Sequence, residues 1–206
     1  MWKKILSYGI WILKNWRSVW TKLLTVIGNI KIFKTPCFCI YDPAEFDYMV
    51  RGEVIREIEV LLQPGDVVLR GYKHFLDGYL IPGELSHSGI YIGDGKIIHA
   101  VAEGVKEVDL IDFFQCDKLA ILRPASGQDK AIERVKGWLG RGYDFFFTNE
   151  SSEFYCHELT ASAYKELDIQ AYPVKIWKWK LPCLGQKYLA ESFLTNKNFT
   201  MVIKNV

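Results

Sequence analysis

The chain has 206 residues, of which 50% are hydrophobic and 15% aromatic, so its composition is that of a globular domain and excludes a disordered chain. The net charge of +2 hides an asymmetry, because residues 1–41 carry seven Lys or Arg and no acid, whereas the rest of the chain has 19 basic and 24 acidic residues. Five cysteines are an odd number without a small disulfide framework, which favours reduced thiols. The remaining charge is scattered, so we expect no nucleic-acid partner.

The first 30 residues predict a basic amphipathic helix. Apolar residues from Trp2 to Ile27 recur at helical spacing, and Lys3, Lys14 and Lys22 fall on the opposite face. Such a helix lies in a bilayer interface, and packing on the protein's own core is the alternative. Its charges make it a poor transmembrane span, and no small-residue cleavage site follows. We therefore expect a cytoplasmic or peripheral membrane protein, with an arm over residues 1–35 and one domain over residues 36–206.

The segment after the arm predicts a helix, a turn and a strand. Cys37 and Cys39 have no second pair of ligands at zinc-site spacing, so we expect no metal and no cofactor. Apolar spacing predicts a helix over 42–62, and Pro64-Gly65 predicts a turn into a strand over 66–70. An aromatic loop over 71–83 follows, and its Tyr72 is a candidate for the wall of a pocket.

A β-hairpin over residues 86–100 contains two of the four histidines. Alternating residues from Gly89 to Ile92 predict a strand, Asp94-Gly95 is a strong hairpin signal, and a returning strand begins at Ile97. His87 precedes the first strand and His99 lies on the second. Because cross-strand neighbours on one face approach each other, we expect the sheet to bring both imidazole rings together.

A helix starting near Cys156 is the second focus of the chain. Leu159, Ala163 and Leu167 recur at four-residue spacing after several polar residues that can cap a helix. A thiol at a helix N-terminus feels the positive end of the helix dipole, and a nearby imidazole adds to that effect, so we expect a lowered pKa for Cys156. His157 is one residue further along the helix, about 100° away, where we expect a supporting or exposed side chain.

These motifs, in this order, resemble the permuted NlpC/P60 papain-like superfamily. The run His-x-Gly-Ile-Tyr-Ile-Gly-Asp-Gly-x-Ile-Ile-His from His87, followed by Tyr-Cys-x-Glu-Leu from Tyr155, is similar to the YiiX-like thiol hydrolases, with lecithin:retinol acyltransferase-like proteins as cousins. The strand over 66–70 and Gly142-Tyr143-Asp144 resemble flanking parts of that pattern. The resemblance implies an α+β, circularly permuted papain-like fold, in which an antiparallel sheet or small barrel packs against helices.

The resemblance also implies roles for particular residues. Cys156 is expected as the nucleophile and His87 as its general base, with Tyr155 and Tyr72 as oxyanion or pocket candidates. A third polar residue orients the base: the YiiX-like members usually carry a glutamate and the acyltransferase cousins a second histidine. Both His99 and Glu103 are candidates here, and His99 occupies the matching place.

Three classes of function follow from this interpretation. The first is a cysteine hydrolase that cleaves an amide or ester bond through a thioester, with a peptide or amide as its substrate. The second is an acyltransferase or phospholipase acting on acyl-lipids at a membrane surface contacted by residues 1–30. The third is a binding module that kept the fold without catalysis.

Overall fold

The computed structural model describes residues 50–72, 83–148, 152–176, 179–180 and 185–205, together with residues 18, 20, 22, 23 and 26 of the arm, which are helical. The junction between the arm and the domain, the Cys37–Cys39 pair and residues 42–49 of the predicted first helix lie outside these ranges. In the part of the chain that is described, no helix has the length and apolarity needed to cross a membrane.

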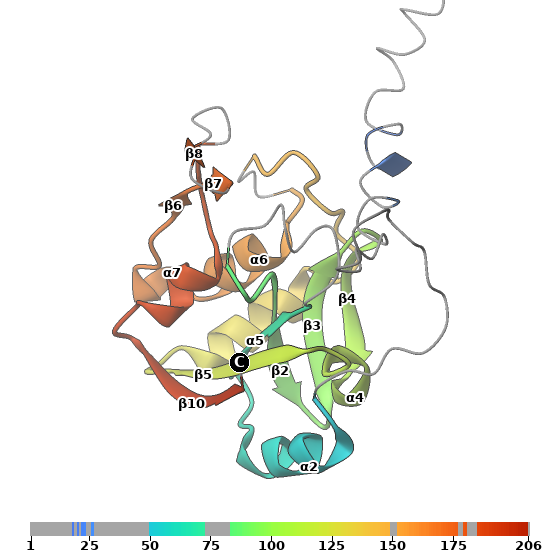
Figure 1. Ribbon diagram of the computed structural model, residues 1–206, viewed down its shortest axis with the longest axis vertical. Helices are drawn as coiled ribbons and strands as arrows, with labels where there is room; N and C mark the ends of the chain where they lie inside the picture. The colour runs from blue at the N-terminus through green and yellow to red at the C-terminus, as the bar shows by residue number, and fades with distance from the viewer. Residues whose placement is uncertain are drawn as a thin grey trace, which may run out of the picture.

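A six-stranded antiparallel sheet forms the centre of the domain (Figure 1). Its spatial order is β10-β5-β1-β2-β3-β4. The strands are β1 (Val67–Gly71), β2 (His87–Gly93), β3 (Lys96–Val101), β4 (Gly104–Asp109), β5 (Lys118–Pro124) and β10 (Phe199–Asn205). Two short pairs lie outside it, β6 (Tyr172–Pro173) with β9 (Gln186–Lys187) and β7 (Lys175–Ile176) with β8 (Trp179–Lys180). The predicted α+β class with an antiparallel sheet against helices is confirmed.

Helices cover both faces of this sheet, because successive strand residues point to opposite sides. Val67 and Leu69 of β1 belong to a core with α5 (Gln128–Gly137), α6 (Cys156–Ala163) and α7 (Ala190–Leu194). Val68 between them belongs to a second core with α2 (Gly52–Leu61) and α4 (Leu110–Phe113). We call these two sides the α6 face and the α4 face.

The hairpin of β2 and β3 forms as the sequence predicts. Asp94 and Gly95 have φ of 51° and 68°, the left-handed backbone that a tight hairpin turn requires at both central positions. Gly89 pairs with His99 in the ladder, and Ile90 pairs with Ile98. This register places His99 opposite Gly89, two residues from His87 and on the same face of the sheet.

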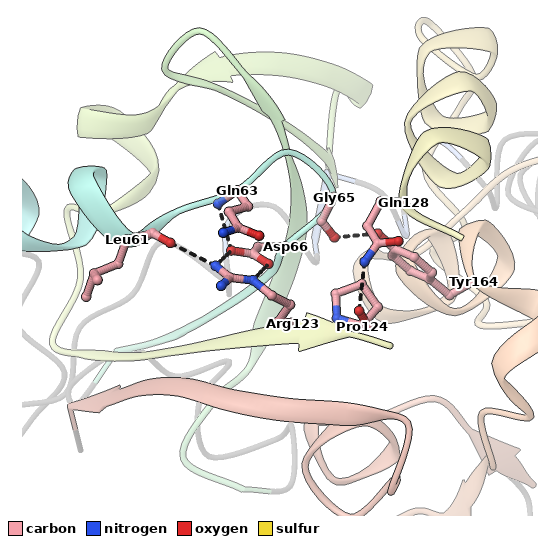
Figure 2. Close-up of polar contacts among 8 residues, drawn as sticks. All are labelled: Leu61, Gln63, Gly65, Asp66, Arg123, Pro124, Gln128 and Tyr164. Atoms are coloured by element: carbon pink, nitrogen blue, oxygen red, sulfur yellow. Dashed lines mark hydrogen bonds and ion pairs between the residues drawn. The ribbon is translucent and has the colours of Figure 1, made fainter. Parts of the chain in front are cut away.

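A polar cluster at the start of β1 joins this strand to three other parts of the chain (Figure 2). Asp66 is buried and forms an ion pair with Arg123 of β5, whose guanidinium also donates to the Leu61 carbonyl at the end of α2. The Tyr164 hydroxyl, just past α6, donates to the carbonyl of Gly65. The cluster therefore fixes β1 relative to α2, β5 and the helix that carries Cys156.

Two predicted helices differ from the observed ones. Residues 50 and 51 are not helical, so α2 begins at Gly52 rather than running on from residue 42. The Val50 N–H donates to the Cys116 carbonyl at 3.1 Å, and this contact holds the backbone outside a helix. α6 ends at Ala163, and the short 3₁₀ helix Lys165–Leu167 follows in place of its last turn.

Candidate active site

The buried Cys156 is the first residue of α6. Tyr155 before it is extended, and its N–H donates to the carboxylate of Glu158 at 3.4 Å, which starts the helix at the cysteine. The Cys156 Sγ lies 3.8 Å from the carbonyl oxygen of Ser86, the residue that precedes His87. The thiol therefore lies at the point where β2 begins.

His87 and His99 form a hydrogen-bonded pair on the α4 face. His87 Nε2 lies 2.9 Å from His99 Nδ1, and the ring centroids are 5.1 Å apart in an edge-to-face arrangement. Phe113 of α4 packs against both rings, at 5.7 Å from His87 and 5.5 Å from His99. The expectation that the hairpin brings the two imidazoles together is confirmed.

Arg70 is a residue of this site that the sequence analysis did not single out. It lies opposite His87 in the β1–β2 ladder, and its Cζ is 4.4 Å from the centroid of the Phe113 ring. Its positive charge disfavours protonation of both His87 and His99 and favours ionisation of Cys156. An arginine inside an otherwise apolar strand, Val67 to Leu69, was the signal available in the sequence.

Burial decides the charge state of the reactive groups. Desolvation, with a smaller contribution from Arg70, holds the pKa of His87 well below 6.5 and lowers that of His99 to about 3. Desolvation also raises the pKa of Cys156 to about 11, although backbone hydrogen bonds at Ser88, His157 and Cys156 act in the opposite direction. The expected fall in the pKa of Cys156 is therefore wrong, because burial outweighs the helix N-terminus. In the resting protein both the Cys156 thiol and the His87 imidazole are therefore neutral at neutral pH.

A buried polar network that contacts the backbone of Cys156 was also not predicted from the sequence. The Ser88 hydroxyl donates to the carbonyl of Cys156 at 3.0 Å and lies 2.9 Å from Thr160 Oγ1. His157 is buried, with Nδ1 2.9 Å from Ser88 Oγ. His157 is thus a supporting residue and not an exposed one. The alternation of β2 points Ser88 at α6 and His87 at α4, and this pattern was the signal in the sequence from which the network could have been predicted.

The three remaining candidates occupy different places. Glu103 is exposed in the turn between β3 and β4, where its carboxylate pairs with Lys106 at 3.3 Å, so it does not orient His87 in this structure. The Tyr155 hydroxyl accepts the N–H of Tyr188 at 2.8 Å, and its buried ring anchors the start of α6. Tyr72 lies beside the site, with its ring centroid 5.4 Å from the Cζ of Arg70.

A strand histidine that precedes a helix-borne cysteine, on an antiparallel sheet, defines a permuted papain-like protein. A family model described as "Permuted papain-like amidase enzyme, YaeF/YiiX, C92 family" matches residues 61–201. The chain belongs to this family, and its kind of activity is that of a cysteine hydrolase of the amidase type.

A solved structure shares the fold. It is described as the metalloprotein YiiX from Escherichia coli O157:H7, and it superposes with a TM-score of 0.57 at 18% sequence identity. The match covers 70% of the present chain and 98% of the YiiX chain. No curated protein matches the chain.

Proposed function

We propose that this protein hydrolyses an amide bond through a thioester on Cys156, with His87 as general base and acid and His99 as the residue that orients it. The observation that carries the proposal is the hydrogen bond between His87 Nε2 and His99 Nδ1, together with the 3.8 Å between the Cys156 Sγ and the carbonyl oxygen of Ser86, the residue before His87. The order of the motifs and the family membership support the same assignment.

The chemistry follows from one tautomer. When the Nε2–H of His87 donates to His99, the Nδ1 of His87 is unprotonated and can take the thiol proton. Sγ attacks the substrate carbonyl as this proton leaves, and backbone N–H groups at the start of α6 stabilise the oxyanion. The proton then passes to the leaving amine, and the C–N bond breaks. Water, deprotonated by His87, cleaves the thioester and regenerates the thiol.

The neutral resting pair suits this sequence of steps. Because burial opposes any isolated charge, the thiolate and imidazolium form together and only during attack, where the oxyanion donors offset their cost. Among the described residues, no three His, Cys, Asp or Glu side chains are grouped as a metal site needs. The proposed steps use no metal ion.

The test is formation of an acyl-enzyme. The full-length protein is mixed with p-nitrophenyl acetate, and the acetylated residue is located by mass spectrometry of its peptides. We expect a burst of nitrophenol and acetyl on Cys156 in the wild type and in Cys116→Ala, and neither in Cys156→Ala. Cys116 is a matched control because it is the other described cysteine, is also buried, and has a pKa raised to about 12. Absence of a Cys156 adduct would favour the binding module instead.

An acyltransferase or phospholipase at a membrane remains the second candidate, and one observation favours membrane contact. In the arm, Leu23 and Val26 are 46% and 61% exposed, so these apolar side chains are not covered by the domain. We expect the full-length protein to sediment with anionic vesicles and a variant lacking residues 1–30 to stay in the supernatant. Equal sedimentation of both would exclude the arm as the membrane-binding segment.

A further inference from the structure

The guanidinium of Arg70 is held in place by contacts that use only part of its hydrogen-bonding capacity. Its Nη1 donates to the carbonyl of Phe113 at 2.8 Å. Its Cζ lies 4.4 Å from the Phe113 ring centroid and 5.4 Å from that of Tyr72. These contacts fix the plane of the group without neutralising its charge.

One edge of this guanidinium has no partner within the described part of the chain. Nε is buried and makes no hydrogen bond, and Nη2 has none either. These two donors form the side-on edge that receives a carboxylate through two parallel hydrogen bonds. A buried donor without a partner costs free energy and therefore needs an explanation.

A second arginine of the same protein, Arg123, shows how the side-on edge of a guanidinium binds a carboxylate. Arg123 donates from Nε to Asp66 Oδ1 at 2.9 Å and from Nη2 to Asp66 Oδ2 at 2.8 Å (Figure 2). Among the described residues, the ion pairs include this one but none that involves Arg70. The neutral imidazoles and thiol beside Arg70 supply no counter-charge.

The position of Arg70 places its side chain beside the histidine pair. Arg70 faces His87 across the β1–β2 ladder, and the Phe113 ring on which it stacks contacts both His87 and His99. Its charge acts on the protonation of His87 and Cys156 alike. An anionic group bound by Arg70 would therefore lie close to His87, the proposed general base.

We infer that Arg70 is a specificity residue that binds a carboxylate of the substrate side-on, so that the preferred substrates are amides carrying a free carboxylate near the scissile bond. This inference rests on the proposed function, because it assigns the substrate class of the same site. A planar carboxylate fits the fork of an arginine, whereas a lysine offers only a point charge.

The experiment compares two alkylating reagents of nearly equal size on Cys156. Iodoacetate carries a carboxylate and iodoacetamide does not, so the ratio of their rate constants cancels changes in the thiol itself. The ratio is measured by mass spectrometry in the full-length wild type, Arg70→Met, Arg70→Lys and Lys106→Met. Lys106 is the control because it is another nearby cation, and it is exposed and paired with Glu103.

We expect Arg70→Met to lower the iodoacetate-to-iodoacetamide ratio about tenfold or more, as loss of a charge-assisted hydrogen-bond pair implies. Arg70→Lys should recover only part of it, and Lys106→Met should stay within about twofold of the wild type. An unchanged ratio in Arg70→Met overturns the inference. Full recovery in Arg70→Lys overturns it too, since a point charge would then suffice.

A second measurement does not depend on the thiol. Glutarate, a dicarboxylate, should raise the Tm of the wild type but not that of Arg70→Met. If Cys156 reacts with neither reagent, the proposed function fails, and the glutarate shift still decides whether Arg70 binds carboxylates. A shift that persists in Arg70→Met overturns the inference.

Discussion

At the scale of single residues, the charge state of His87 depends on which side chain lies against its Nε2. His99 lies within 2.9 Å of it, whereas Glu103 is exposed and paired with Lys106. A neutral imidazole partner adds no negative charge beside His87, so it does not offset the desolvation that lowers the pKa of that histidine. The third member of the proposed triad is thus an orienting group more than a counter-ion.

The first prediction separates the two candidates for this position. His99→Ala should lower kcat by about 10²–10⁴-fold, because His87 loses the partner that fixes its tautomer and orientation. Glu103→Gln should leave kcat within about twofold. The measurement is steady-state hydrolysis of the p-nitrophenyl ester, and a large loss in Glu103→Gln with little in His99→Ala would reverse the assignment.

The second prediction concerns the pH dependence of the thiol. Because burial raises the pKa of Cys156 to about 11, the thiolate fraction in the resting protein keeps growing as the pH rises past 9. Alkylation of Cys156 by iodoacetamide should therefore accelerate through that pH. Peptide mass spectrometry follows the rate, and a plateau near neutral pH would reveal a stable thiolate–imidazolium pair instead.

At the scale of secondary-structure elements, Ser88 connects the histidine strand to the cysteine helix. Its hydroxyl donates to the Cys156 carbonyl, and His157 and Thr160 surround it. Since β2 and α6 are 68 residues apart at this contact, the network sets how His87 and Cys156 lie relative to each other. The network lies on the α6 face, opposite the α4 face that carries His87 and His99.

The third prediction tests this network. Ser88→Ala should lower the free energy of unfolding by about 1–3 kcal/mol, because buried partners of the hydroxyl are left unsatisfied. It should also lower kcat more than it raises KM, since the displaced groups react but do not bind substrate. Urea unfolding and ester hydrolysis measure the two effects. A stability as high as that of the wild type would show that the network contributes nothing.

At the scale of the whole molecule, titratable groups that are wholly or partly buried link folding to pH. His87, His99 and His157 all have pKa values below 6.5 in the folded state, the last two about 3, mainly through desolvation. Below pH 6.5 the unfolded chain binds more protons at these sites, so stability falls as the pH decreases towards 3. Burial raises the pKa of Glu158 to about 7, so the folded protein binds more protons than the unfolded chain at this carboxylate between pH 4.5 and 7. Between pH 4.5 and 6.5 this offsets the acid loss of stability from one histidine.

The fourth prediction follows from these signs. Each buried histidine contributes about 1.4 kcal/mol per pH unit to the acid loss of stability, so His157→Gln should make that slope shallower by this amount. Glu158→Gln should instead make the slope steeper between pH 4.5 and 6.5, because the folded protein no longer takes up a proton at this position. Urea unfolding at a series of pH values measures the slopes, and equal slopes in all three proteins would contradict the linkage.

The sequence by itself determined the local parts of this protein. Asp94-Gly95 specifies the hairpin, the alternation of β2 and β3 puts His87 and His99 on one face, and the start of α6 at Cys156 follows from local spacing. These features depend on neighbours along the chain, so pattern and propensity suffice for them. The permuted order of histidine and cysteine motifs then identified the family.

Only the tertiary structure decided the electrostatics and the partners. Burial is a property of the packed domain, so the raised pKa of Cys156 could not be derived from its place at a helix N-terminus. Ser88 contacts α6 and Arg70 contacts α4, and neither contact could be derived from the sequence because the partners are distant along the chain. The β3–β4 turn, in which the Glu103 carboxylate pairs with Lys106, likewise supports the proposal of His99 over Glu103 as the orienting residue.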